Sequence, residues 1–273
     1  MDVQAHLRGA YERAAPTYER AGFAHHAPFA AQLAEMVRLG PGGRVLDVGC
    51  GAGGALLPAA QRVGPTGEAI GIDLSPAMVE RTREAAAEAG LEQVQAHVMD
   101  GAALEFEDER FDAVLAAFVL AAIPDADAAL AEWRRVLRPT GTIAVGGWEN
   151  LLDNRWTWEG ELIRELASEV PQELLQEVGR MTGRFATASA LRAGLEGAGF
   201  NEVTVERMDV ERTYPDAEAW WDWSWSGGAR AFLEALPEAA QARFRERGLE
   251  RLRGAGRDGL TRRFVALLAR ARY

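Results

Sequence analysis

The spacing of apolar side chains along the chain alternates between the periods expected of buried strands and of helices. Short apolar runs bounded by turn residues or an acid predict five strands, at residues 44–48, 69–73, 94–99, 111–120 and 141–148. The fourth of these runs includes the exit loop of its strand. Between the runs, apolar residues recur three or four positions apart, which predicts amphipathic helices. Strands that alternate with helices indicate right-handed crossovers and a doubly wound parallel sheet.

After the fifth predicted strand this alternation is interrupted twice. Residues 150–183 carry tryptophan and leucine in a largely helical pattern, and a second helical insertion spans about 215–259. Between the insertions the core resumes with a helix at 186–200 and a sixth strand at 202–208, and an apolar run at 262–271 suits a last strand. We therefore expect an α/β fold with a doubly wound, Rossmann-like, mostly parallel sheet of seven strands and helical lid insertions.

The first predicted strand leads into a glycine-rich turn and then into a helix. In the stretch RVLDVGCGAGG, residues 44–54, Gly49, Gly51 and Gly53 follow one another at two-residue spacing, before a helical run at 55–61. Glycine in such a turn lets a ligand approach bare backbone amides at a helix N-terminus. The sequence therefore predicts that this turn binds a ligand.

Two kinds of ligand suit the turn. Gly49, Gly51 and Gly54 satisfy the G-x-G-x-x-G dinucleotide fingerprint, and Asp73 stands about 20 residues further on, as that fingerprint expects. Asp47 favours the other kind, because a carboxylate at the strand end repels a diphosphate and attracts a ligand that carries an ammonium and a sulfonium. The stretch resembles motif I, E/D-x-G-x-G-x-G, of the class I S-adenosylmethionine-dependent methyltransferases, which holds the methionine end of the cofactor.

Acids also end the second and third predicted strands, at the edge where ligands bind in open α/β sheets. The resemblance covers residues 10–210 and the final strand, and the chain most resembles the methyltransferases of ubiquinone and menaquinone biosynthesis, a group with many natural-product enzymes. It implies that Asp73 binds both ribose hydroxyls, since a carboxylate can accept two hydrogen bonds from a vicinal diol. Leu74 and Met78 are expected to line the adenine.

The same resemblance extends to the end of the third strand. Asp100 matches the family residue that accepts a hydrogen bond from the adenine amino group, and Gly101 and Ala102 offer backbone amides beside it. The remaining expected cofactor contacts are Phe118, in the loop after the fourth strand, and Tyr11 and Tyr18 near the N-terminus.

One departure from the family concerns the proton acceptor. Many relatives carry a histidine or another polar group just after the fourth strand, where this chain has FVLAAIPD. If the accepting group carries a proton, a base must therefore come from elsewhere, and histidine has the unperturbed pKa best suited to neutral pH. The candidates are His25 and His26 in the N-terminal segment, Glu149 after the fifth strand, and Tyr11, Tyr18 or Tyr214.

Four tryptophans gather in the second insertion, at Trp220, Trp221, Trp223 and Trp225. Flat aromatic walls of this kind can clasp an aromatic or polyketide-like substrate. Helical spacing also places Trp221 and Trp225 on one face, as simple packing of a lid requires. The pattern leaves both interpretations open.

Composition narrows the class of protein. The chain has 273 residues, a formal net charge of -11 and a single cysteine, Cys50, which excludes an intramolecular disulfide and a cysteine-based zinc site. The negative charge argues against nucleic acid as a partner, and no motif typical of a metal site occurs. Because no apolar run approaches the roughly 18 residues of a membrane span and no apolar signal core is visible, we expect no membrane partner and a cytoplasmic location.

These observations predict an enzyme that transfers the methyl group of S-adenosylmethionine to an O, N or C atom of a small-molecule, secondary-metabolite-like substrate. The alternatives are a cyclase of the same fold that binds the cofactor without methylating, and a nicotinamide-dependent oxidoreductase. The oligomeric state is open, with a homodimer as one alternative. The predicted parts are a helical lid at 1–40, a cofactor-binding core at 41–149 and 186–213, helical caps at 150–185 and 214–259, and a last core strand at 260–273.

Overall fold

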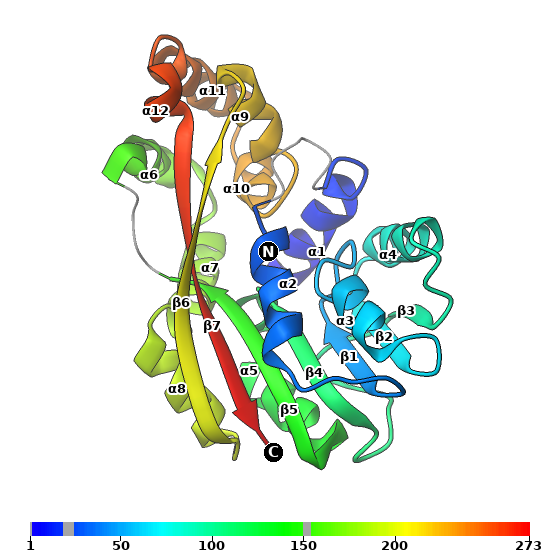
Figure 1. Cartoon of the computed structure of the whole chain (residues 1–273). Coiled ribbons are helices and arrows are strands. Elements are labelled where there is room, and N and C mark those ends of the chain that lie inside the picture. Colours follow the sequence, from blue (N-terminus) through cyan, green and yellow to red (C-terminus); the bar gives the residue numbers. More distant parts are fainter. Residues whose placement is uncertain (1, 19–24, 150–153) are drawn as a thin grey trace. The chain divides into compact units, whose positions relative to one another are not determined.

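The computed structural model describes residues 2–18, 25–149 and 154–273, and its chain divides into two compact units (Figure 1). The helical unit comprises Met1–His25, Leu151–Arg180 and Asp209–Val265. The sheet unit comprises His26–Asn150, Met181–Met208 and Ala266–Tyr273. This division separates neighbouring residues at 25 and 26 and cuts two long strands, whereas the predicted parts meet at 40/41, 149/150, 185/186, 213/214 and 259/260. The predicted functional segments, a lid and two caps, stay predictions.

A seven-stranded sheet runs in the order β3-β2-β1-β4-β5-β7-β6. Its strands are β1 Arg44–Val48, β2 Glu68–Asp73, β3 Val94–Val98, β4 Phe111–Ala117, β5 Leu137–Trp148, β6 Asn201–Thr213 and β7 Thr261–Arg272. The pairs β1–β2, β2–β3, β1–β4 and β4–β5 are parallel, and β7 is antiparallel to β5. The predicted α/β fold with a mostly parallel sheet is confirmed. The strand order reverses at β1, which makes its carboxyl end the expected ligand site.

Helices flank this sheet, and others belong to the helical unit. The sheet unit contains α2 Ala27–Met36, α3 Leu56–Val63, α4 Pro76–Glu88, the short 3-10 helix η1 Leu120–Ala122, α5 Ala126–Val136 and α8 Ala188–Gly197. The helical unit contains α1 Val3–Ala14, η2 Asn154–Trp156, α6 Thr157–Leu166, η3 Ala167–Glu169, α9 Ala217–Ser224, α10 Ala229–Ala235, α11 Glu238–Leu252 and α12 Gly256–Leu260. Helix α7, Gln172–Arg184, crosses the division between the units.

Local sequence signals set where these helices begin. The Ser75 hydroxyl caps α4 by accepting a hydrogen bond from the Met78 amide, and Pro76 occupies the first turn. Pro28 lies in the first turn of α2, where its missing amide costs nothing. Strand β5 begins at Leu137, four residues before the predicted start at Gly141. Its pairing with β4 shifts register across this early part, which contains Pro139, a residue that cannot donate to a ladder.

The core of the sheet unit lies on both faces of the sheet. On one face, alternate strand residues such as Leu46, Ile70 and Val114 pack with Trp133 of α5 and Leu195 of α8. The other face carries α2, α3 and α4, which contact β5, β1 and β2 respectively. Because side chains alternate along a strand, Asp47 points to this second face, between the strand and the helices that follow the glycine turn.

The helical unit has a separate aromatic core. Trp220 is fully buried, its ring stacks on that of Phe244 with centroids 5.5 Å apart, and a β-carbon at Gly248 would lie 2.1 Å from it. Trp221 contacts Trp220 and Trp225 at centroid distances of 6.2 and 5.6 Å. These contacts fit the packing interpretation of the tryptophan cluster. No helix in the part of the chain that the structure describes is long and apolar enough to cross a membrane.

Candidate functional site

The turn after β1 is built from glycines in a conformation that other residues avoid. Gly49, Gly51 and Gly53 have φ angles of 67°, 54° and 87°, in the left-handed region. A β-carbon on Gly49 would also lie 2.4 Å from Cγ2 of Val119, in the loop after β4. Glycine is therefore required at position 49 both by the backbone and by the close approach of the neighbouring loop.

Asp73, at the end of β2, ties this turn to the next one. Its Oδ2 accepts a hydrogen bond of 3.0 Å from the Gly51 amide, and its Oδ1 accepts one of 2.9 Å from the Ser75 amide. Each carboxylate oxygen can accept a second hydrogen bond, so the side chain can hold the turn and still receive the hydroxyls of a ligand. The predicted pair Asp73 and Gly51 is thus brought together by the fold.

Asp47 is the unusual group of the site. The residue is 1% exposed, and neither carboxylate oxygen accepts a hydrogen bond of ordinary geometry in the described part of the chain. Burial raises the pKa of its carboxyl to about 8; the Leu56 amide favours the charged form, while the charge of Asp73 opposes it. Buried polar groups are nearly always paired. A buried carboxyl of this kind, beside the glycine turn, is therefore suited to a ligand that brings its own cation.

The end of β3 is fixed against the end of β1. Asp100 Oδ1 accepts a hydrogen bond of 2.9 Å from the Ala102 amide. Between them, a β-carbon on Gly101 would lie 2.7 Å from Cγ1 of Val48, and the Gly101 carbonyl accepts a hydrogen bond of 2.8 Å from Trp133 Nε1. The three predicted acids thus lie at or close to the carboxyl ends of β1, β2 and β3, which are neighbouring strands of one sheet.

The other two residues predicted at the adenine differ in exposure. Leu74 is half-buried, whereas Met78 is 1% exposed and its amide donates a hydrogen bond of 3.2 Å to the capping hydroxyl of Ser75. Both lie directly after β2, in the same unit as the glycine turn. Their contact with a cofactor stays a prediction.

At the ends of β4 and β5 four rings meet, of which the sequence singled out only two. Phe118 and Trp148 lie with centroids 4.2 Å apart and ring planes at 30°. His26 lies 5.1 Å from Phe118 and 5.2 Å from Trp148, and Phe29 lies 5.8 and 5.7 Å from the same rings. Phe29 and Trp148 were missed because each looks like an ordinary apolar residue; the position of Trp148 at a strand end was the available signal.

The two adjacent histidines fall in different units. Burial lowers the pKa of His26 to about 4, so its imidazole is neutral at pH 7. His25, in the helical unit, stacks on Phe264 with centroids 4.3 Å apart, and its Nδ1 accepts a hydrogen bond of 3.3 Å from Trp223 Nε1. Because that bond occupies the Nδ1 lone pair, the proton of neutral His25 is on Nε2.

The remaining predicted residues have other surroundings. Glu149 accepts a hydrogen bond of 2.6 Å from Arg207 Nε within the sheet unit. Tyr11 and Tyr18 belong to the helical unit, with ring centroids 6.3 Å apart. Tyr214 is 1% exposed in the same unit, and its burial raises the pKa of the phenol well above its ordinary value. The roles of these residues stay predictions.

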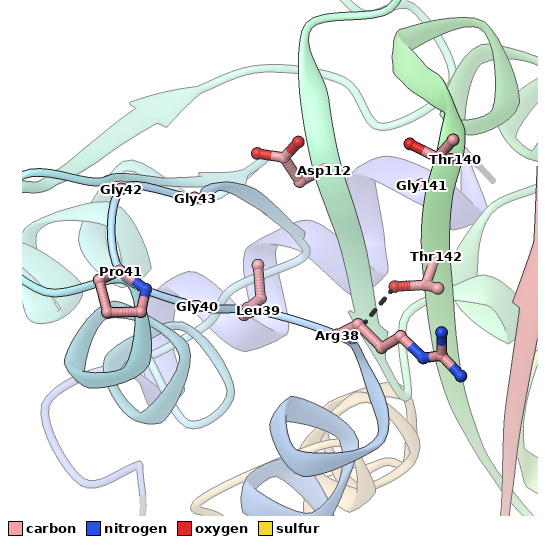
Figure 2. A pocket seen from close by; sticks show the side chains of 10 residues that line it. All are labelled: Arg38, Leu39, Gly40, Pro41, Gly42, Gly43, Asp112, Thr140, Gly141 and Thr142. Carbon is pink, nitrogen blue, oxygen red and sulfur yellow. Dashed lines mark hydrogen bonds between the residues drawn. The ribbon is translucent and has the colours of Figure 1, made fainter.

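A cavity of about 360 Å³ opens at the opposite edge of the sheet, at the amino ends of β1 and β4 (Figure 2). Figure 2 shows Asp112 and Thr142 beside the glycine-rich turn that enters β1, with the Arg38 amide bonded to Thr142 Oγ1 at 3.4 Å. Ligands of open α/β sheets bind at the carboxyl ends, so this cavity is separate from the predicted site. Among the residues that the structure describes, no three acidic, histidine or cysteine side chains gather as a metal site would require.

Comparison with known proteins agrees with this geometry. Residues 39–210 match a family described as a methyltransferase domain. The chain is 36% identical over 233 residues to a nocamycin O-methyltransferase of Saccharothrix syringae, covering 83% of each protein. It is 38% identical over 135 residues to an aklanonic acid methyltransferase of a Streptomyces species, covering 50% of this chain and 61% of that protein.

Solved structures share the fold at low identity. The YcgJ protein of Bacillus subtilis superposes with a TM-score of 0.59 at 20% identity, over 89% of this chain and 97% of the other. The [4+2]-cyclase SpnF superposes with a TM-score of 0.55 at 22% identity, over 90% of this chain and 80% of the other. Similarity at this level establishes the fold alone. By its sequence match over most of its length, the chain belongs to the methyltransferase domain family and is a class I S-adenosylmethionine-dependent methyltransferase.

Proposed function

We propose that the protein methylates a hydroxyl oxygen of a small-molecule acceptor. The observation that carries the cofactor half of this proposal is Asp47, a buried carboxyl that accepts no hydrogen bond of ordinary geometry from the described residues and lies beside a turn of left-handed glycines. The 36% identity to an O-methyltransferase over 83% of both chains supports oxygen as the accepting atom. The sequence alone left O, N and C open.

On the cofactor side, each residue has a proposed task. S-adenosylmethionine supplies a methyl group already activated on a sulfonium, so the protein provides binding, alignment and exclusion of water. Asp47 pairs with the ammonium group of the methionine end, and the amides of Gly49, Gly51 and Gly53 line the approach. Asp73 binds the ribose hydroxyls. The adenine is held by Asp100, Gly101, Ala102, Leu74 and Met78, and Phe118, Tyr11 and Tyr18 are further proposed contacts.

On the acceptor side, we assign proton acceptance first to His26. It lies beside Phe118 at the ends of β4 and β5, in the same unit as the glycine turn, and it is neutral at pH 7. The Nδ1 lone pair of His25 accepts a hydrogen bond from Trp223, and Glu149 forms an ion pair with Arg207. These two residues are therefore the second and third candidates for the proton acceptor. Because the low pKa of His26 makes it a weak base, His26→Gln is expected to lower kcat by about tenfold, below the usual range for a general base.

The remaining proposals concern location and partners. The net charge of -11 supports a small-molecule partner rather than nucleic acid. We also propose a cytoplasmic location and a homodimer. Light scattering of the full chain at micromolar concentration measures the oligomeric state directly.

Calorimetry and a methyl-transfer assay on the full chain test the proposed function. S-adenosylhomocysteine is titrated into the parent, Asp73→Asn, Asp73→Ala and a control, Asp112→Asn, at the opposite edge of the sheet. Loss of the ribose hydrogen bonds in Asp73→Ala is expected to weaken binding by roughly 2–4 kcal/mol, which is about 30- to 1000-fold. Asp112→Asn is expected to bind as the parent does.

The accepting atom is then read from the product. Tritium-labelled methyl is transferred in a metabolite extract, and the labelled product is fragmented in a mass spectrometer to locate the methyl group. Unchanged cofactor affinity in Asp73→Ala, or tight binding of a nicotinamide dinucleotide by the parent, would overturn the cofactor site. Label on nitrogen or carbon would overturn the oxygen assignment.

A further inference from the structure

Four rings from three separate parts of the sheet unit meet at the carboxyl ends of β4 and β5. We define this aromatic platform as His26 and Phe29 of the α2 region, Phe118 after β4 and Trp148 at the end of β5. Phe29 is fully buried, and His26 and Phe118 are half-buried. Trp148 differs, since 37% of it is exposed, and among the described residues the only other large apolar side chain so exposed is Val98. The platform therefore combines a buried aromatic base with an exposed indole.

The backbone beneath the platform is strained. Phe118 has a φ angle of 63°, in the left-handed region of backbone conformation. This conformation is unfavourable by about 1–2 kcal/mol for a residue with a β-carbon. Its amide is held in place by a hydrogen bond of 2.9 Å to the Gly146 carbonyl, and its ring by the close contact with Trp148. Gly147, directly before Trp148, has open space within 4 Å of where a β-carbon would lie. Strain of this kind persists where the surrounding structure fixes a residue for a task, and it clusters at functional sites.

The platform also lies next to the proposed cofactor turn. Val119, which follows Phe118, approaches Gly49 closely enough to exclude a β-carbon there. Strands β1 and β4 are neighbours, with Asp47 opposite Leu115, so Phe118 is three residues beyond the partner of Asp47. The platform is thus one strand away from the end of the site that receives the methionine portion of the cofactor.

Resting on the proposed function, we propose that Trp148 forms the floor of the acceptor site and that the acceptor is a planar, conjugated hydroxyl compound, a phenol or an enol, stacked on the platform. Aromatic rings prefer offset stacking, which a flat acceptor satisfies and a puckered ring does not. His26, whose ring lies 5.1 Å from that of Phe118 and 5.2 Å from that of Trp148, is close enough to receive the hydroxyl proton of a ring stacked there. Its neutral imidazole suits a hydroxyl that is itself acidic, which phenols and enols are and aliphatic alcohols are not.

A matched pair of probes tests this assignment. The complex of the full chain with S-adenosylhomocysteine is titrated with 2-naphthol and with decahydro-2-naphthol, which carry the same carbon skeleton and hydroxyl but differ in planarity. We expect 2-naphthol to bind at least tenfold more tightly. Trp148→Leu should remove this preference, and Trp148→Phe should keep it within about threefold, while both variants bind S-adenosylhomocysteine as the parent does.

Trp221→Leu, the same change in a half-buried tryptophan of the helical unit, is the control and should keep the full preference. Equal binding of the two probes by the parent, or an unchanged preference in Trp148→Leu, overturns the assignment, as does an equal loss in Trp221→Leu. If S-adenosylhomocysteine does not bind the parent, the proposed function fails, and the same titrations on the ligand-free chain still decide whether Trp148 selects planar rings.

Discussion

Two buried carboxyl groups, one in each unit, have opposite surroundings. Asp47 of the sheet unit is 1% exposed, and its oxygens accept no hydrogen bond of ordinary geometry from the described part of the chain. Glu159 of the helical unit is also buried, but its Oε2 lies 2.8 Å from Arg262 Nη1 and its Oε1 accepts a hydrogen bond of 2.8 Å from Trp220 Nε1. Arg262 in turn lies over the rings of Trp156, Trp223 and Phe264.

The difference separates a structural carboxylate from a binding one. A buried charge is tolerated when it is paired, and Glu159 has its cation within the same unit. A buried carboxyl that lacks a partner loses its charge instead, as the raised pKa of Asp47 indicates. Glu159 is therefore complete without a ligand, whereas Asp47 regains a stable charge only when a cation arrives.

Removing the charge of Glu159 should give the largest effect on stability. Glu159→Gln leaves the Arg262 guanidinium buried without a counter-charge, and breaking such a pair costs about 3–5 kcal/mol. Denaturant unfolding of the ligand-free chain measures this loss. Glu165→Gln, which breaks an exposed ion pair with Arg247, is the control and should leave the midpoint unchanged. Equal midpoints for the two variants would contradict the structural role of Glu159.

The equivalent change at Asp47 should act in the opposite direction. At pH 7 Asp47 is protonated in the folded chain and ionised in the unfolded chain, and this difference lowers the free energy of unfolding. Because pH 7 lies about three pH units above the ordinary pKa of the carboxyl, and each unit corresponds to about 1.4 kcal/mol, the cost is up to about 4 kcal/mol. Asp47→Asn removes the cost, so the ligand-free variant should be more stable than the parent by up to that amount. It should also lose most of the thermal stabilisation by S-adenosylhomocysteine. A destabilised variant would show that Asp47 is charged in the ligand-free fold.

The stability difference between Asp47→Asn and the parent should depend on pH. Since the folded pKa of Asp47 is raised, the folded chain binds the extra proton between about pH 4 and pH 8, and its contribution to stability falls as pH rises through that window. The charge of Asp73 acts in the same direction on the Asp47 pKa, and the Cys50 thiol stays protonated because burial raises its pKa. The stability gain of Asp47→Asn should therefore shrink at lower pH and vanish near pH 4. A gain that is independent of pH would contradict this account.

Cofactor binding should then release a proton. If the ammonium group of the cofactor converts Asp47 to a carboxylate, close to one proton leaves per site at pH 7, and the apparent affinity rises with pH up to about 8. Calorimetric titrations of S-adenosylhomocysteine in phosphate and in Tris measure this release. The two buffers differ in ionisation enthalpy, so the difference between the two observed binding enthalpies gives the number of protons released. Asp47→Asn should show none. Equal release in parent and variant would move the proton to another group.

The smallest effect is expected when both members of the pair in the helical unit are replaced. Glu159→Leu with Arg262→Met exchanges an ion pair for apolar groups of similar size, a change that is often neutral in buried sites. We expect the double variant to unfold within about 1 kcal/mol of the parent, far from the sum of the single losses. A loss as large as that of Glu159→Gln would mean that the Trp220 hydrogen bond, and not the ion pair, carries the stability.

The local sequence pattern was enough to predict the features that depend only on residues close together in the chain. The first four predicted strands start within a residue of their observed starts. The glycine turn and the acids at or close to the ends of β1, β2 and β3 follow directly from residues within a few positions of one another. The early start of β5 at Leu137 was missed, because Pro139 argues against a strand until the register shift that accommodates it is known.

Features that depend on distant residues could not be predicted in this way. Glu159 and Arg262 meet across more than a hundred residues of sequence, and neither carries a local sign of its partner. Trp148 and Phe29 join Phe118 only because α2 packs on β4 and β5. The sequence likewise predicted a carboxylate at Asp47, but only the structure shows that the described residues around it supply no hydrogen bond of ordinary geometry.

The sheet order has a consequence for folding during synthesis. Strand β7 lies between β5 and β6, although it is the last of the three to be made. The ladder that joins β5 to β7 therefore cannot form while the ribosome is still producing α9 to α12, and β6 must wait beside exposed edges. In a nascent chain at this stage one edge of β5 and both edges of β6 are unpaired, so its yield in the cell should depend on chaperones that shield such edges until β7 arrives.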